Sequence, residues 1–195
     1  MYRVSSDIRT DLQTQQWRLD QQYTDSGDRM SRLKSIRRRM AMFCINHFLA
    51  GTHFFNAKRK LLNSAGYQIG NNTKVVGPLF LTGELRVGED CWIGRDFTVD
   101  GNGAVEIGNR CDIAPSVCFF TGTHAIGDHS RRAGTGSNGR IIIQDGCWIG
   151  GRASFMNPVT VHAGSVIAAC ACVCSDIPAD VLAGGVPARV IKQLH

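Results

Sequence analysis

An aliphatic residue or phenylalanine returns at every sixth position over more than half of the chain. The repeat slips by two residues after Val99, stops after Phe119 and resumes at Ile143. A period of six differs from the 3.6 of a helix and from the 2 of an exposed strand. It is typical of a solenoid with a triangular coil, in which each side points one large apolar residue inward. These anchors predict about five coils of three sides each. They are Ile69, Val75, Leu81, Val87, Ile93, Val99, Ile107, Ile113, Phe119, Ile143, Ile149, Phe155, Val161, Ile167 and Val173.

Two other positions of the repeat have a regular composition. Four residues after the anchor the side chain is usually small or medium, as expected for a second inward position in a narrow prism. These residues are Thr73, Cys91, Cys111, Val117, Cys147, Ala153, Val159, Ser165 and Ala171. Cys91, Cys111 and Cys147 are therefore expected to fill the core. Glycine often follows the anchor directly, as at Gly70 and Gly150, where we expect a corner that needs permissive backbone angles.

Three segments of the repeat region carry a specific resemblance: 121–124 (Thr-Gly-Thr-His), 147–152 (Cys-Trp-Ile-Gly-Gly-Arg) and 176–192. They resemble the hexapeptide-repeat acyltransferases, among them the polysaccharide and sugar O-acetyltransferases. The resemblance covers residues 69–192. It implies a mainly β fold, a left-handed parallel β-helix of about five coils, which is an exception to the usual right-handed crossover. It also implies a homotrimer, because in this family the donor groove lies between adjacent solenoids.

The N-terminal region has a different composition. The net charge is +6, and residues 1–66 hold 12 Lys and Arg against 5 Asp. Helices are expected at 5–25 and 29–62. We therefore divide the chain into a basic helical region (1–66), the β-helix domain (67–178, with a loop at 121–141) and a C-terminal capping segment (179–195). The helices are expected to cap the solenoid, as terminal repeats require. The apolar part of the second helix, residues 40–55, is too short and too polar to span a membrane. The cations on both sides of it are compatible with membrane-surface contact through 29–62. Nucleic-acid binding is not expected, because no recognisable module is present.

The loop contains the candidate base. In the family, a histidine at the base of this loop removes the proton from the acceptor, and His124 occupies the matching position. Imidazole titrates near neutral pH, so it can take the proton of a hydroxyl as the oxygen attacks a thioester. Asp100 matches an acceptor-binding aspartate of galactoside and maltose acetyltransferases, and Asn102 lies beside it. Arg131 and Arg132 are candidates for an anionic sugar or for the donor phosphates, although solvated charge explains them equally well.

The resemblance also implies a donor site for acetyl-coenzyme A (acetyl-CoA). Trp148, Gly150 and Gly151 match the stretch that lines the groove for the pantetheine arm, although Trp148 is equally explained as a subunit contact. Small residues at Ala168 and Ala169 leave room for the arm. On the C-terminal segment, Arg189 and Lys192 are candidates for phosphate neutralisation. The residues predicted to bind the donor are Trp148, Gly150, Gly151, Ala168, Ala169, Arg189 and Lys192.

The cysteines and histidines bear on the cellular compartment of the protein and on metal binding. Eight cysteines without a recognisable export signal favour a reducing compartment, so we expect a cytoplasmic protein. A location peripheral to the inner face of the membrane stays open. Cys170, Cys172 and Cys174 are expected to line the core or the groove. His124 and His129 have the spacing of two zinc ligands in gamma-class carbonic anhydrases, but residues 69–123 contain no third histidine. No metal site is therefore expected.

The sequence predicts an acetyl-CoA-dependent O-acetyltransferase that modifies a hydroxyl of a sugar or glycan of the capsule or exopolysaccharide type. Two alternatives stay open: a gamma carbonic anhydrase-like zinc enzyme, and a non-catalytic solenoid that serves as a scaffold. Which sugar, which hydroxyl, the acyl chain length and the choice between O- and N-acylation do not follow from the residues.

Overall fold

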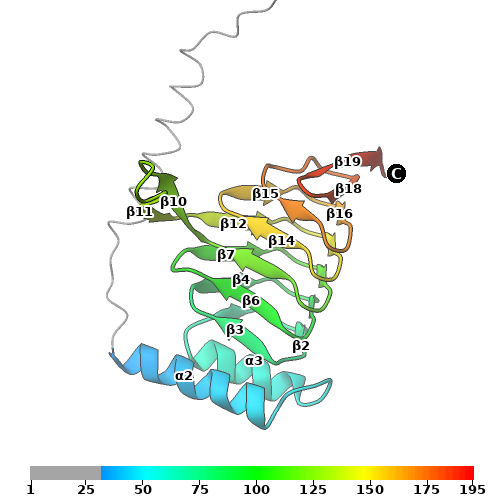
Figure 1. Cartoon of the computed structure of the whole chain (residues 1–195). Coiled ribbons are helices and arrows are strands. Elements are labelled where there is room, and N and C mark those ends of the chain that lie inside the picture. Colours follow the sequence, from blue (N-terminus) through cyan, green and yellow to red (C-terminus); the bar gives the residue numbers. More distant parts are fainter. Residues whose placement is uncertain (1–31) are drawn as a thin grey trace, which may run out of the picture.

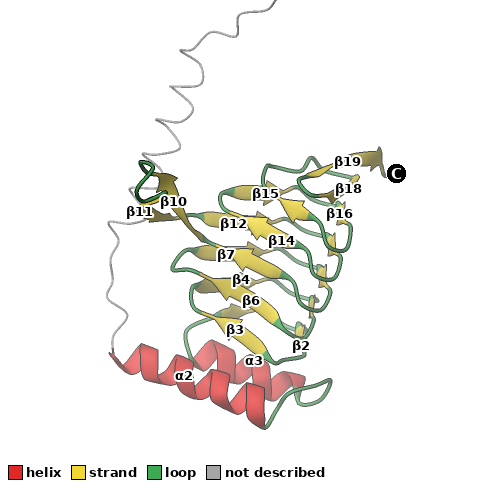
Figure 2. Ribbon diagram, in the orientation of Figure 1, coloured by secondary structure: helices red, strands yellow, loops and turns green. Residues whose placement is uncertain are grey.

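The computed structural model describes residues 32–195. It consists of two N-terminal helices followed by a β-solenoid, which rises from the helices as a stack of coils (Figures 1 and 2). The helix expected at 5–25 lies outside the described residues. Three parallel sheets form the sides of the solenoid, and each coil contributes one short strand to each sheet.

Sheet 1 has five parallel strands. They are β1 (Gln68–Ile69), β4 (Glu84–Val87), β7 (Ala104–Ile107), β12 (Arg140–Ile143) and β15 (Val159–Val161). Sheet 3 also has five. They are β3 (Leu79–Leu81), β6 (Phe97–Asp100), β9 (Cys118–Phe120), β14 (Ser154–Met156) and β17 (Cys172–Val173).

Sheet 2 has six parallel strands and a seventh that is antiparallel. They are β2 (Lys74–Val75), β5 (Trp92–Ile93), β8 (Asp112–Ile113), β13 (Trp148–Ile149), β16 (Val166–Ile167), β18 (Val181–Gly185) and the antiparallel β19 (Ala188–Gln193). A bridge from Ile177 to Val161 and strand β18 add part of a sixth coil to five complete ones. The predicted parallel β-helix of about five coils with an N-terminal helical region is confirmed.

The interior follows the six-residue repeat. All fifteen anchors are buried, and so are the nine small or medium residues four positions later. Phe97 occupies the same second position and is an exception to its usual small or medium size, since it is also fully buried. Its ring lies 5.4 Å from that of Phe119, which in turn stacks on Phe155 at 4.8 Å between centroids. The prism therefore holds a short column of aromatic rings.

The glycines after the anchors have a different function from the one expected. A Cβ atom on Gly70 would lie 2.5 Å from the Gly88 backbone in the next coil, so glycine is needed for close stacking of coils. The left-handed backbone falls two residues later. Asn72, Asp90 and Arg110 have φ between 53° and 57°, and each is the third residue after its anchor. The sequence indicated a corner correctly but assigned its strained residue to the wrong position.

The helical segment is split in two. Helix α2 (Arg32–His47) ends before a loop that contains Gly51 with a φ of 96°, and α3 (Phe55–Ser64) follows. Both helices lie across the first coil, where Ala41, Ile45 and Leu62 join the core (Figure 1). Neither of the described helices is long and apolar enough to cross a membrane.

Two buried cations attach the helices to the solenoid. The guanidinium of Arg38 is 2.8 Å from a carboxylate oxygen of Glu84 and lies over the ring of Tyr67. The ammonium of Lys58 donates hydrogen bonds to the backbone carbonyls of Gly51 and Val76. Burial lowers the pKa of Lys58, yet two carbonyl partners compensate for part of the lost hydration.

Candidate functional site

The insertion predicted at 121–141 forms a β-hairpin that projects from the solenoid. Strand β9 of sheet 3 leads into β10 (Gly122–Ile126), and β11 (Ala133–Asn138) returns antiparallel to it before sheet 1 resumes with β12 (Figure 2). The hairpin therefore leaves the prism at the corner between sheets 3 and 1, which we call the hairpin corner. His124 lies on β10 and pairs with Gly136 on β11.

A buried threonine fixes the base of the hairpin. The hydroxyl of Thr121 donates to the Asp100 carbonyl at 2.9 Å and accepts from the Gly103 N–H at 3.1 Å. The amide oxygen of Asn138 accepts from the Asn102 N–H at 3.1 Å. These bonds hold both ends of the hairpin against the turn that follows β6. The structure thus brings the predicted residues Asp100 and Asn102 to the base of the hairpin that carries His124.

One hydrogen bond orients the ring of His124. Its Nδ1 atom lies 2.9 Å from the carbonyl oxygen of Gly134. A carbonyl oxygen only accepts, so Nδ1 carries the hydrogen in this pair, and Nε2 keeps its lone pair in the neutral ring. The side chain is exposed at the surface of the hairpin. The histidine is therefore prepared to accept a proton at Nε2 from a group in solvent.

A cavity of about 450 Å³ lies beside this ring. His124 and Asp100 both line it, so two predicted residues share one cavity. Phe120, Ser137 and Asn138 line it as well, and sequence reasoning missed them. No motif in the sequence marked these residues, and Asn138 lies five residues before Ile143, at which the repeat resumes. The cavity combines a proton acceptor, a carboxylate, hydroxyl and amide groups, and one aromatic ring.

The two predicted arginines lie elsewhere. Arg131 and Arg132 follow a turn in which Asp128 accepts hydrogen bonds from Ser130 and from the Arg131 N–H. These bonds lower the pKa of Asp128. Arg132 donates to the Gly127 carbonyl at 3.3 Å. Neither arginine is among the described residues that line the cavity beside His124.

Four predicted donor residues meet at a different corner, where the chain passes from sheet 2 to sheet 3. We call it the small-residue corner. A Cβ atom on Gly150 would lie 2.5 Å from the Ala169 nitrogen, so these two coils are stacked as closely as the backbone permits. A Cβ on Gly184 would likewise lie 2.8 Å from the Cβ of Ala168. Gly151 follows Gly150 at the same corner. The result is a column of small residues in the upper coils of this corner, formed by Gly150, Gly151, Ala168 and Ala169.

The remaining donor candidates flank this column. Trp148 projects outward from β13 and is 58% exposed. Arg189 and Lys192 lie exposed on β19, where they pair with Gly184 and Leu182 of β18. The guanidinium of Arg189 donates to the Ala188 carbonyl at 2.7 Å. Within one chain, the donor candidates and His124 thus lie at two different corners of the prism.

The cysteines divide into two groups. Cys91, Cys111 and Cys147 are buried core residues, as predicted, and burial raises the pKa of Cys147. Cys170, Cys172 and Cys174 do not line the core, because Cys170 and Cys174 are exposed and Cys172 is half-buried; that they line the groove stays a prediction. Cys172 follows the inward-pointing Ala171, so alternation along the strand turns it outward. Among the described residues no group of three His, Cys, Asp or Glu side chains is placed to hold a metal ion.

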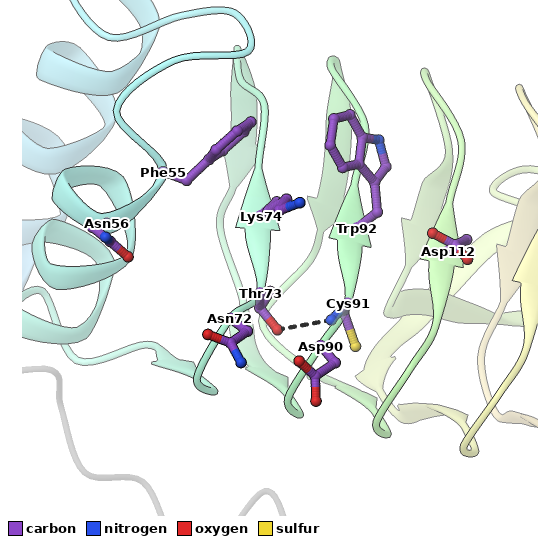
Figure 3. A pocket seen from close by; sticks show the side chains of 9 residues that line it. All are labelled: Phe55, Asn56, Asn72, Thr73, Lys74, Asp90, Cys91, Trp92 and Asp112. Atoms are coloured by element: carbon purple, nitrogen blue, oxygen red, sulfur yellow. Dashed lines mark hydrogen bonds between the residues drawn. The ribbon is translucent and has the colours of Figure 1, made fainter.

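A second cavity, of about 600 Å³, lies over sheet 2 near α3. Figure 3 shows Phe55 and Trp92 on one side of it, and Lys74, Asp90 and Asp112 around it. The rings of Phe55 and Trp92 are 5.8 Å apart, so this contact attaches α3 to the sheet. No histidine is among its described lining residues. The cavity beside His124 is therefore the better candidate for acid–base chemistry.

Known proteins resemble the chain over most of its length, although no protein-family model matches it. It is 27% identical to the galactoside O-acetyltransferase of Escherichia coli (strain K12) over 83% of this chain and 80% of that protein. It is 30% identical to a putative colanic acid biosynthesis acetyltransferase of the same strain, over 68% of this chain and 72% of that protein.

Among solved structures, a hexapeptide-repeat containing acetyltransferase from Vibrio cholerae O1 biovar eltor, complexed with acetyl-CoA, superposes with a TM-score of 0.75. The two are 26% identical, and the match covers 87% of this chain and 91% of that one. The repeat, the coil geometry and these relatives agree. The chain belongs to the hexapeptide-repeat acetyltransferases.

Proposed function

We propose that the enzyme is an acetyl-CoA-dependent O-acetyltransferase that transfers acetyl to a hydroxyl of a sugar or glycan, with His124 as the general base. The observation that carries this proposal is the bond between Nδ1 of His124 and the Gly134 carbonyl, because it leaves Nε2 free to accept a proton. The donor is inferred from the Vibrio cholerae relative, which was solved with acetyl-CoA.

The reaction needs one proton relay. Nε2 of His124 takes the hydroxyl proton while the oxygen forms a bond to the thioester carbonyl carbon. The C–S bond of the tetrahedral intermediate then breaks, and the imidazolium returns the proton to the sulfur of coenzyme A. The products are an acetyl ester and free coenzyme A. Direct transfer of this kind leaves no acetyl group on the enzyme.

The cavity beside His124 supports a polyhydroxylated acceptor. Asp100, Ser137 and Asn138 provide hydrogen-bond acceptors and donors around it, and Phe120 provides an apolar surface for the C–H face of a sugar ring. A glycan of the capsule or exopolysaccharide type is the acceptor class that we favour. The E. coli relatives, a galactoside O-acetyltransferase and a putative colanic acid biosynthesis acetyltransferase, support it.

The separation of the two corners supports a homotrimer. Since His124 and the donor candidates lie at different corners of one prism, a complete site needs the hairpin of one subunit against the small-residue corner of its neighbour. The hairpin tip has the apolar surface that such a contact requires, because Ile126 is 88% exposed. In this arrangement Trp148, Gly150, Gly151, Ala168 and Ala169 receive the pantetheine arm, and Arg189 and Lys192 meet its phosphates. A cytoplasmic location, where acetyl-CoA is made, fits this reaction.

Release of coenzyme A from acetyl-CoA tests the function, measured against a panel of sugars, nucleotide sugars and oligosaccharides. We expect turnover that depends on the acceptor, together with an acetyl ester that mild alkali hydrolyses. An alkali-stable amide in the product would instead show N-acylation. Failure to bind acetyl-CoA in calorimetry would contradict the proposal and favour a scaffold.

A further inference from the structure

Helix α2 presents large apolar side chains to solvent. Leu33, Ile36, Met40 and Phe43 are each more than half exposed. Their spacing of three and four residues places them on one side of the helix. Phe48 continues this surface, since its ring lies 5.7 Å from that of Phe43. We call these five residues the apolar end surface. A contiguous apolar patch of this kind marks an interaction site on a folded protein.

The opposite side of α2 is already occupied. Ala41 and Ile45 are fully buried against the solenoid, and Arg38 is held by Glu84 on β4. The helix is therefore fixed, with its apolar end surface directed away from the solenoid. In Figure 1 the two helices lie at the end of the molecule, beyond the first coil. Within residues 32–195, no further coil lies beyond the helices on that side.

The charge around this surface has one sign. The sequence contains no Asp or Glu between residues 29 and 83, whereas 32–66 alone holds eight Lys and Arg. Arg37 and Arg39 are exposed on α2 itself, and Lys60 is exposed on α3. An apolar face bordered by cations is the pattern of a helix that lies in the interface of an anionic bilayer. The apolar residues enter the boundary of the acyl chains, while the cations meet the lipid phosphates.

We propose that the apolar end surface binds an anionic lipid bilayer. The net charge of each candidate partner distinguishes an anionic bilayer from a second copy of this surface and from residues 1–31. A second copy of the same surface would bring two cationic helices together, which like-charge repulsion opposes. Residues 1–31 carry four Arg against five Asp, a balance too close to neutral to complement the excess on 32–66. A bilayer of anionic lipid matches both the apolar side chains and the charge.

The proposal also narrows the acceptor class, and this step rests on the proposed function. An acetyltransferase held at a membrane surface has its site beside glycans that are attached to lipid carriers. Lipid-linked glycans are thus the acceptors that this surface favours. Lipid binding itself does not depend on that function, so the two can fail separately.

Flotation of the full chain with vesicles tests the surface. Vesicles of phosphatidylcholine alone are compared with vesicles that also contain phosphatidylglycerol, at low and at high salt. The variant Met40→Glu/Phe43→Glu removes apolar contact at exposed positions, and Arg37→Gln/Arg39→Gln removes two cations. The matched control, Arg86→Gln/Arg110→Gln, removes two exposed cations from the solenoid away from the small-residue corner. Circular dichroism and acetyl-CoA affinity establish that each variant is folded.

We expect the wild type to bind the anionic vesicles and to release them as salt rises. Binding should fall about tenfold or more in Met40→Glu/Phe43→Glu, by a smaller factor in Arg37→Gln/Arg39→Gln, and little in the control. The proposal is overturned if the wild type ignores anionic vesicles at low salt, binds neutral vesicles equally well, or binds unchanged after Met40→Glu/Phe43→Glu. Retained acetyl-CoA binding in those cases would leave the acetyltransferase proposal intact.

Discussion

The hairpin corner and the small-residue corner are built from the same repeat and differ in almost every other respect. At the first, the repeat stops for a polar hairpin that carries His124. At the second, the repeat continues without interruption, and glycine and alanine stack from coil to coil. Proton transfer requires a side chain placed outside the regular coil, whereas a long, thin donor requires a groove that nothing obstructs. The solenoid provides these two kinds of surface at separate edges, and under the proposed function a complete site would therefore need a second subunit.

The largest expected effect concerns the hairpin corner. His124→Ala should lower kcat by about 10²- to 10⁴-fold, because the acceptor hydroxyl then has no proton acceptor. Affinity for acetyl-CoA should stay unchanged, since the donor candidates lie at the other corner. Coenzyme A release and calorimetry measure the two quantities. His129→Ala, five residues further along the hairpin, is the control and should retain activity; a comparable loss in that variant would transfer the role of base to His129.

Complementation between subunits tests the separation directly. Ala169→Trp should obstruct the donor groove without disturbing the core, because Ala169 is exposed. Neither this variant nor His124→Ala should be active alone. Co-expressed in equal amounts, they should recover about one quarter of wild-type activity if each site combines two subunits of a cyclic trimer. If the mixed trimer of these two inactive variants is also inactive, both halves of the site lie in one chain and the proposed arrangement is wrong.

A smaller effect on activity is expected from a substitution of Thr121 at the base of the hairpin. Thr121→Val keeps the shape of the side chain but removes the hydroxyl that bonds to Asp100 and Gly103. It should cost about 1–2 kcal/mol of unfolding free energy. It should also lower kcat about tenfold, because His124 loses its fixed position relative to Asp100. Thr135→Val, on the exposed part of β11, should change neither quantity; equal losses there would indicate a general effect of the hairpin.

The smallest expected effect is on stability and concerns Asp145 at the third corner of the prism, between sheets 1 and 2. Hydrogen bonds from the Asn109 N–H and side chain lower the pKa of Asp145. Its contribution to stability is therefore present above the unfolded pKa near 4 and is lost as pH falls through the lowered folded pKa. Because the carboxylate is exposed, the contribution should stay below about 1 kcal/mol. Urea unfolding at pH 6 and pH 3 should show a larger loss for the wild type than for Asp145→Asn, and identical losses would contradict this role.

Sequence reasoning recovered the parts of the molecule that obey the period of six. Every anchor from Ile69 to Val173 is buried, and the interruption predicted at 121–141 is the hairpin. It failed where contacts between distant segments decide the outcome. Phe97 fits the interior because Phe119 packs beside it, and Gly70 is glycine because Gly88 lies so close in the next coil. Such constraints are properties of stacking, which a single coil does not display.

The candidate site shows the same limit. His124 and Asp100 could be predicted from motif and position, and the structure places both at one cavity. Phe120, Ser137 and Asn138 could not, because their places follow from the path of β11 back to the solenoid. The break between α2 and α3 was missed because the apolar residues at 40–55 were interpreted as one segment. Gly51, with its positive φ, marks the interruption.

The two ends of the solenoid have a consequence for self-association. A stack of parallel strands offers unpaired backbone groups at its first and last coil, and such edges can recruit strands from other molecules into fibrils. Here α2 and α3 cover the first coil, and β19 runs antiparallel along the last strand of sheet 2. An incoming chain therefore meets helices at the first coil and an antiparallel strand at the edge of sheet 2. The segments that complete the fold thus restrict the addition of strands from other molecules at both of these places.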